Sequence, residues 1–167
     1  MRWARPEGVH LTLKFLGDIE ASAVDAISRA MARAAQGVAP LELALAGTGA
    51  FPTARDPRVL WVGLKGDVES LARLQGRLDA ELAPLGFPKE ARAFSPHLTL
   101  GRVRDGAARG ERQRIGDAIA TARLPNEARW RADSLSLMRS TLAPAGAIYQ
   151  RIAQIGLTPP LPGGGAR

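Results

Sequence analysis

The tetrapeptide His10-Leu11-Thr12-Leu13 occurs a second time, as His97-Leu98-Thr99-Leu100. The chain of 167 residues contains only two histidines, and each stands at the head of one copy. Such a coincidence calls for a search for internal repeats before any fold is assigned. The two copies therefore decide how the rest of the chain is interpreted.

Both copies have the pattern of a half-buried strand. From residue 9 to residue 16, apolar residues alternate with His10, Thr12 and Lys14, a period of two that predicts a strand with these three side chains on one face. The second copy predicts a strand at about 97–103. Each His and the Thr two residues later are thus expected on the same side of their strand.

The predicted elements around the two copies follow a common order. The second half predicts strand 58–64, helix 68–83, strand 97–103, helix 110–123, and strands 131–139 and 147–155. The first half predicts strand 9–16, helix 22–35, and strands 41–46 and 58–64. This is the same order without an opening strand and helix, which we expect to be missing from the first lobe.

The repeat predicts two halves related by an approximate two-fold axis, with the two His and two Thr facing a shared cleft. We expect one domain over 1–157, with lobes at about 1–57 and 58–157 that can exchange strands, and a flexible tail at 158–167. Glycine and proline predict a loop at 47–57 and a turn at 142–146.

Two further expectations concern local structure. Asp67 precedes the helix 68–83 and is expected to cap its N-terminus, and Gly86 is expected to end it. Trp61, within the β-forming stretch RVLWVGL, is assigned to the core.

Composition narrows the class of protein. A hydrophobic content of 46% favours a folded domain, and the absence of cysteine excludes disulfides, thiolate metal ligands and cysteine nucleophiles. No apolar run reaches the length of about 18 residues that a membrane span requires, and the first ten residues do not resemble a signal peptide. We expect a soluble, cytoplasmic protein without a membrane or an obligate protein partner.

The net charge of +7 and pI near 11.1 indicate a polyanionic partner. The alternative without a functional role is a solvated basic surface. Of the 23 basic residues, 20 are arginine, and a GC-rich genome could account for part of this excess.

The paired motifs supply the groups for cleaving a phosphodiester. One imidazole can serve as base and the other as acid near neutral pH, and each Thr hydroxyl can donate to an anionic oxygen. An in-line displacement at phosphorus needs a base behind the attacking oxygen and an acid behind the leaving one. The residue types leave open which His has which role.

These residues also carry a family resemblance. The first motif followed by KFLGD, and the second preceded by Ser95-Pro96 and followed by GRV, resemble the paired HxTx motifs of the 2H phosphoesterase superfamily. The stretch from Gly47 to Leu64 resembles its RNA 2′,3′-cyclic phosphodiesterase branch, also called 2′-5′ RNA ligase. The likeness covers nearly all of residues 3–155. It implies a bilobal α+β fold with a pseudo-two-fold axis, in which two antiparallel sheets line a central cleft and the helices lie outside.

The resemblance implies hydrolysis of RNA 2′,3′-cyclic phosphate ends, tRNA fragments included, to 2′-phosphomonoesters, with no metal or other cofactor. It makes His10 the proton donor to the leaving 3′-oxygen and His97 the base that activates water. Thr12 and Thr99 would hold the non-bridging phosphate oxygens. Ligation through a 2′-5′ linkage would be the reverse reaction.

Other residues are secondary candidates for substrate contact. Lys14 shares the predicted face of His10, whereas strict alternation points Arg102 away from His97, so a role for Arg102 requires a bulge or the end of the strand. Phe51 and Phe94 offer faces on which a base can stack. Arg58, with Arg55, is expected at the rim of the cleft.

Two competing interpretations come from other classes. A metal site built on the two histidines needs carboxylate ligands that no motif supplies. A non-catalytic RNA-binding module is supported by the charge and by the expected absence of the opening strand and helix, and it predicts that replacing His10 or His97 leaves RNA affinity and function largely unchanged.

Overall fold

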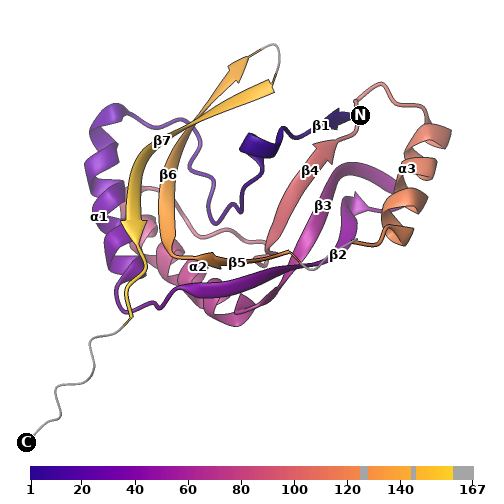
Figure 1. Cartoon of the computed structure of the whole chain (residues 1–167). Helices are drawn as coiled ribbons and strands as arrows, with labels where there is room; N and C mark the ends of the chain where they lie inside the picture. Colours follow the sequence, from indigo (N-terminus) through magenta and orange to yellow (C-terminus); the bar gives the residue numbers. More distant parts are fainter. Residues whose placement is uncertain (125–127, 144–145, 160–167) are drawn as a thin grey trace, which may run out of the picture. The chain divides into compact units, whose positions relative to one another are not determined.

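The computed structural model describes residues 1–124, 128–143 and 146–159. The strands are β1 (Arg2–Trp3), β2 (Leu41–Thr53), β3 (Asp56–Gly66), β4 (His97–Arg102), β5 (Arg129–Ala132), β6 (Ser134–Ala143) and β7 (Gly146–Gly156). The helices are α1 (Val24–Ala35), α2 (Val68–Leu82) and α3 (Arg109–Thr121), with 3-10 turns at Pro6–Gly8, Ala21–Ala23 and Ala83–Leu85. The expected α+β class with antiparallel sheets is confirmed (Figure 1).

The chain forms two compact units that are interleaved along the sequence. Unit 1 comprises Met1–Thr12, Leu43–Gly66 and Ser95–Trp130, and unit 2 comprises Leu13–Glu42, Asp67–Phe94 and Arg131–Arg167. The expected lobes at about 1–57 and 58–157 do not coincide with these units. Strands from both halves of the sequence share the sheet of unit 1, and the two HLTL copies lie next to each other there.

Unit 1 is built on a five-stranded sheet with the order β1-β4-β3-β2-β5. Leu60 and Val62 of β3 point to its buried face and are only 3% and 2% exposed. Helix α3 belongs to this unit and packs on β3, and Thr48 Oγ1 of β2 donates to the Ile119 carbonyl of α3 at 2.8 Å. Gly116 of α3 lies so close to the Ala54 carbonyl that a Cβ would overlap it.

The loop expected at 47–57 is wrong. Strands β2 and β3 continue through this stretch as an antiparallel hairpin that turns after Thr53, where the Asp56 N–H donates to Thr53 Oγ1 at 3.3 Å. The glycine and proline are accommodated by irregularities instead: Gly47, at φ +65°, sits in a bulge between Ala46 and Thr48, and a second register shift falls at Phe51/Pro52.

The strand expected at 9–16 is also wrong, whereas the one expected at 97–103 is confirmed as β4. The first HLTL copy makes a single antiparallel bridge, Leu11 to Leu98. Upstream, β1 pairs with the far end of β4 and the Ala4 N–H donates to the Leu100 carbonyl at 2.8 Å. The 3-10 turn beginning at Pro6 then interrupts the ladder, because proline has no N–H to contribute.

In unit 2, helices α1 and α2 pack on each other, and α1 also packs on the β6–β7 ribbon. The expected helices 22–35 and 68–83 are confirmed as α1 and α2. Their apolar stripes bury the residues Ile27, Met31, Leu71, Leu74, Leu78 and Leu82. Arg77 donates to the carbonyls of Arg33 and Gln36 at 3.0 and 2.8 Å, which satisfies the end of α1.

The ends of two predicted elements differ from expectation. Asp67 occupies the N-cap position of α2, but its side chain makes no capping bond and Oδ2 accepts from the Glu42 N–H at 2.8 Å instead. The strand expected at 131–139 is split at Asp133 into β5 and β6. Gly86, at φ +91°, ends the helical segment as expected.

The remaining sequence expectations concern the chain ends and the membrane. Most of the tail expected at 158–167, and the centre of the turn at 142–146, lie outside the described residues. Among the described residues, no helix is long and apolar enough to cross a membrane.

Candidate active site

The two HLTL copies lie side by side in unit 1. The antiparallel bridge pairs Leu11 with Leu98, so one step along each chain brings His10 opposite Thr99 and Thr12 opposite His97. Opposed residues in an antiparallel pair have Cβ atoms about 4.5–5.5 Å apart. Each histidine therefore neighbours the threonine of the other copy, and all four polar side chains lie on the face opposite to Leu11 and Leu98.

Each imidazole makes an equivalent hydrogen bond to the carbonyl oxygen two residues earlier in the chain. His10 Nδ1 lies 2.7 Å from the Gly8 carbonyl oxygen, and His97 Nδ1 lies 2.7 Å from the Ser95 carbonyl oxygen. Because a carbonyl oxygen only accepts, Nδ1 carries the proton and donates it in both rings. The neutral imidazole then has its basic lone pair at Nε2, so Nε2 is the atom that exchanges a proton with a substrate.

Pairing across the sheet defines which other residues share this face. Trp61 of β3 lies opposite Thr99, and Gly63 lies opposite His97. On the far side of β3, Gly49 of β2 lies opposite Trp61, and Phe51 lies opposite Val59. The face opposite to α3 therefore carries the histidine–threonine pairs together with Phe51 and Trp61.

A bulge brings Arg102 to the same face. Trp61 pairs with Thr99 but Leu60 pairs with Gly101, so Leu100 is skipped in the ladder. Val59, two residues from Trp61 and on its face, then pairs with Arg102. Strict alternation directs Arg102 away from His97, and the extra residue in β4 reverses that direction. Arg102 is exposed there, and contact with substrate stays a prediction.

Aromatic rings surround the second histidine. The Phe51 ring centroid lies 5.0 Å from that of His97 in an edge-to-face arrangement at 77°, and Trp61 lies 6.3 Å from His97 and 5.3 Å from Phe51. The assignment of Trp61 to the core is wrong: it is half-buried on the site face. Its alternation with the buried Leu60 and Val62 was the signal in the sequence that could have placed it there.

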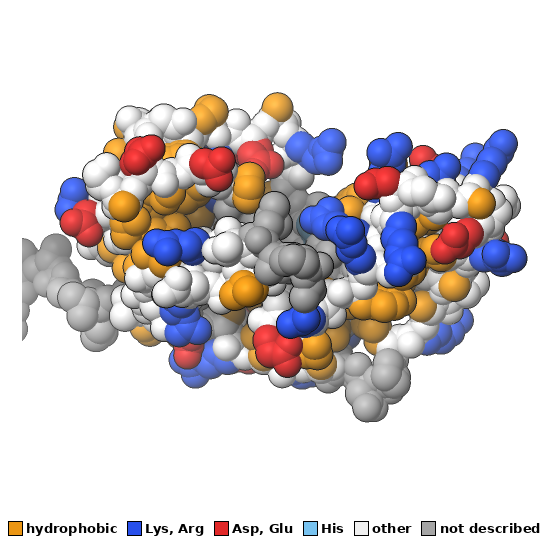
Figure 2. Space-filling model, turned by 90° about the horizontal axis from the view of Figure 1, so that it is seen from above, with side chains coloured by type: hydrophobic (Ala, Val, Ile, Leu, Met, Phe, Trp, Pro, Cys, Tyr) orange, Lys and Arg blue, Asp and Glu red, His pale blue; other side chains and the backbone are white. Residues whose placement is uncertain are grey.

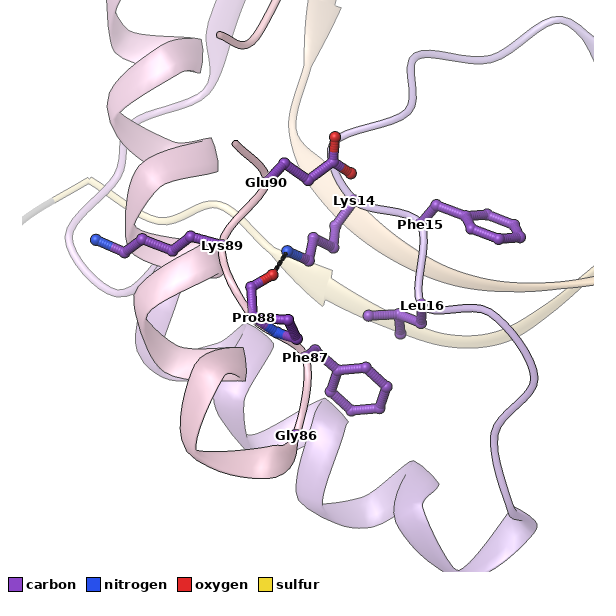
Figure 3. Close-up of a pocket in the computed structure, with 8 residues that line it drawn as sticks. All are labelled: Lys14, Phe15, Leu16, Gly86, Phe87, Pro88, Lys89 and Glu90. Carbon is purple, nitrogen blue, oxygen red and sulfur yellow. Dashed lines mark hydrogen bonds between the residues drawn. The ribbon is translucent and has the colours of Figure 1, made fainter. Parts of the chain in front are cut away.

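Lys14 is held by other groups. Its Nζ lies 2.7 Å from Asp79 Oδ1 of α2, with side chains only 5% and 8% exposed, and it also donates to the Pro88 carbonyl (Figure 3). Lys14 and its partners belong to unit 2, whereas His10 and Thr12 belong to unit 1. The expected phosphate contact stays a prediction, and the buried ion pair argues for a structural role instead.

The ion pair shapes the titration of Asp79. Burial disfavours the charged carboxylate and raises its pKa, but the hydrogen bonds from Lys14 and Gln75, the charge of Lys14 and the Glu90 backbone outweigh that effect. The pKa of Asp79 is therefore lowered from its ordinary value of 3.8. A pocket of about 310 Å³ opens beside Lys14 between Phe15 and the loop Gly86–Glu90 (Figure 3).

The other candidates are placed as follows. Arg58 is exposed at the point where β3 is out of register with β2, and Arg55 is exposed in the hairpin turn. Phe94 is half-buried and belongs to unit 2. Their contacts with substrate stay predictions.

The positive charge is concentrated in the unit that holds the histidines. The segments of unit 1 contain 12 Lys and Arg against 6 Asp and Glu, a net of +6, whereas those of unit 2 contain 11 against 10, a net of +1. Figure 2 shows basic side chains gathered over the right-hand part of the face that it draws, where β4 and α3 lie. A strong local positive potential attracts phosphates.

Within the described ranges, no group of three or more His, Cys, Asp or Glu side chains has an arrangement that could hold a metal ion.

The sequence of this chain is similar to those of known proteins. A sequence profile of the 2′-5′ RNA ligase superfamily matches residues 2–143. A protein of Methanothermobacter thermautotrophicus named RNA 2′,3′-cyclic phosphodiesterase is 35% identical over 149 residues, 89% of this chain and 78% of that protein. The protein of the same name from Aquifex aeolicus is 31% identical over 152 residues, 89% of this chain and 77% of its own.

Solved structures with a similar fold support the same family. The crystal structure of TT0787 of Thermus thermophilus matches with a TM-score of 0.73 and 28% identity, over 93% of this chain and 81% of that one. LigT of E. coli complexed with 3′-AMP matches with a TM-score of 0.71 and 26% identity, over 94% and 81%. The chain belongs to the 2′-5′ RNA ligase superfamily. The expected family, and with it the expectation of an enzyme of the RNA 2′,3′-cyclic phosphodiesterase type, is confirmed.

Proposed function

We propose that this chain hydrolyses 2′,3′-cyclic phosphodiester ends of RNA to 2′-phosphomonoesters by acid–base catalysis with two histidines. The observation that carries the proposal is the bridge between Leu11 and Leu98, which sets His10 and His97 on one face with a threonine beside each. The relatives named RNA 2′,3′-cyclic phosphodiesterase support this substrate class.

The reaction needs one proton acceptor and one proton donor. His97 Nε2 takes a proton from water as its oxygen attacks phosphorus, and the bond from phosphorus to the 3′-oxygen breaks in line with the attack. His10, protonated beforehand, gives a proton from Nε2 to the departing 3′-oxygen. Each Nδ1–H stays bound to its carbonyl throughout, which keeps both rings oriented. Solvent exchange returns both histidines to their starting states.

The threonines stabilise charge on the phosphate. Thr12 and Thr99 each present a hydroxyl on the face of the imidazoles, from which a donor can reach a non-bridging oxygen. Arg102, directed to this face by the bulge in β4, adds positive charge for the RNA backbone.

Charge favours an RNA end over an isolated small phosphate as the physiological substrate. The net of +6 on the segments of unit 1 strengthens the attraction with each added phosphate of a strand. Affinity for a long oligonucleotide should therefore fall steeply with added salt, whereas turnover of a cyclic mononucleotide should fall less.

The test is a short RNA ending in a 2′,3′-cyclic phosphate, incubated with the protein and EDTA in water enriched in ¹⁸O. We expect a 2′-phosphate carrying one labelled oxygen, identified by mass spectrometry and by chromatography against both isomers. His10→Gln and His97→Gln run in parallel, because glutamine keeps the size and polarity but cannot transfer the proton. A 3′-phosphate product, or turnover in either variant equal to that of the wild type, would contradict the proposal.

Ligation is tested in the same reaction. Adding an RNA with a 5′-hydroxyl in excess replaces water as the attacking group, and a 2′-5′ linkage would then form by the same in-line displacement of the 3′-oxygen. Loss of turnover without loss of RNA binding in the variants separates catalysis from the alternative of a non-catalytic RNA-binding module.

A further inference from the structure

We propose that Gly49 and Trp61 are positioning residues for the catalytic ring of His97, with Gly49 acting through the indole of Trp61. The inference rests on the proposed function and adds to it a determinant on a different strand from either HLTL copy. Trp61 packs on the site face of the sheet in unit 1.

Two rows of paired residues cross this face. The first runs from Thr99 on β4 through Trp61 on β3 to Gly49 on β2. The second runs from His97 on β4 through Gly63 on β3 to Ala46 on β2. Trp61 thus has a glycine as its cross-strand neighbour on β2, and another glycine two residues along its own strand.

The missing side chain at Gly49 is replaced by the indole. A Cβ at this position would overlap Cζ2 of Trp61 and would lie 2.6 Å from Cη2 and 2.9 Å from Cε2. Real Cβ atoms do not approach a ring so closely, so any other residue at 49 would push the indole away. Gly49 is not one of the glycines that have a positive φ in the described part of the chain, so its backbone conformation is open to other residues. Space, not backbone freedom, requires glycine here.

The second glycine bounds the indole from the other side. A Cβ at Gly63 would lie 3.4 Å from Cζ3 of Trp61 and 2.7 Å from the Ala46 carbonyl oxygen. The ring therefore lies over both glycine positions, where an aromatic side chain takes the place of the missing ones.

The indole in this position supports the histidine. Its centroid lies 5.3 Å from Phe51 and 6.3 Å from His97, and the edge-to-face pair of Phe51 with His97 completes a set of three rings. The Nδ1 bond to the Ser95 carbonyl holds one edge of the imidazole, and the rings limit rotation of its plane. Displacing Trp61 frees that rotation and moves Nε2 out of line with the attacking water.

The test compares Gly49→Ala with Gly110→Ala, a control in the same unit where an added Cβ meets nothing within 4 Å. We expect Gly49→Ala to lower kcat on a cyclic-phosphate RNA by about 10- to 100-fold, as a displacement of roughly 1 Å does, with KM changed less than threefold. Gly110→Ala should leave both unchanged.

Because the chain contains only two histidines, ¹⁵N-histidine labelling reports each ring separately and does not depend on activity. In Gly49→Ala we expect the nitrogen signals of His97 to shift or broaden, while those of His10 stay in place. If wild-type protein lacks turnover, the proposed function fails but this measurement still reports the packing. Unchanged His97 signals, or equal changes at both histidines, overturn the positioning role.

A double variant distinguishes displacement of the indole from general misfolding. Trp61→Phe removes the part of the indole that an alanine at 49 would strike, so Gly49→Ala/Trp61→Phe should be no worse in kcat than Trp61→Phe alone. Additive losses in that double-mutant cycle would contradict a path from Gly49 through Trp61.

Discussion

The two HLTL copies are identical in sequence and different in structure. His97 begins the regular strand β4, is half-buried and touches two aromatic rings. His10 is exposed in an irregular segment whose backbone forms an isolated bridge with β4 at Leu11. Yet both rings donate from Nδ1 to the carbonyl two residues earlier, at the same distance of 2.7 Å. Local sequence thus sets the orientation of each ring, while the surroundings of each copy come from distant residues.

The residues that follow the copies differ in the same way. The first is followed by Lys14, whose ammonium is buried against Asp79. The second is followed by Gly101, where a Cβ would lie 2.8 Å from the Arg2 carbonyl and 3.1 Å from the Trp3 ring. The chain just after the first copy is therefore held within unit 2 by an ion pair, and the chain just after the second copy is held within unit 1 by close contact with a neighbouring strand.

The strongest test of equivalence is to remove each histidine. His10→Gln and His97→Gln should each lower kcat by about 10²–10⁴-fold, because each removes one of two proton transfers. Single-turnover assays of cyclic-phosphate RNA measure this, and circular dichroism checks the fold. A loss confined to one variant would show that the two copies are not catalytic partners.

The ion pair between Lys14 and Asp79, just after the first copy, is tested by Lys14→Met. This change leaves the carboxylate of Asp79 buried without its partner, and we expect a loss of about 3–5 kcal/mol in the free energy of unfolding. Urea denaturation measures it. Lys89→Met is the control, since Lys89 is an exposed lysine of the same unit.

The same pair sets a dependence of stability on pH. Because the folded-state pKa of Asp79 lies below 3.8, its contribution is present above that pH and is lost as the pH falls through the lowered value. Asp79→Asn should therefore unfold at a midpoint that changes less below pH 4 than that of the wild type. Parallel acid profiles of the two proteins would contradict this.

The threonines should show smaller and matched effects. Thr12→Val and Thr99→Val each remove a hydroxyl at nearly constant volume, and we expect kcat to fall by about 10- to 100-fold. Serine at either position should restore most of the activity. If only Thr99 matters, the exposed first copy does not hold the phosphate.

The smallest effect is expected for Arg102→Gln. The residue reaches the site face only through the bulge at Leu100, and we expect KM for a long RNA to rise by about three- to tenfold with kcat nearly unchanged. Arg104→Gln, an exposed arginine just beyond β4, is the control. Equal effects in both variants would mean that only net charge matters.

The two copies also show what sequence patterns could predict. Alternation and helical periodicity found α1, α2, α3 and β4, because a buried stripe repeats at a fixed period within one element. The same rules failed at 47–57 and at 9–16. Bulges absorb Gly47 and Pro52 into a long hairpin, and Pro6 interrupts the edge along which the first copy lies.

The sequence by itself determined the chemical groups: two imidazoles, two hydroxyls and the family to which they belong, because those depend on residue identity and spacing alone. Only the tertiary structure decided which groups share a face. In the tertiary structure, Arg102 and Trp61 lie on the site face, and the indole of Trp61 packs over Gly49. Lys14 forms an ion pair with Asp79. Such outcomes depend on register shifts and long-range packing, in which a single extra residue turns a side chain to the other face of the sheet.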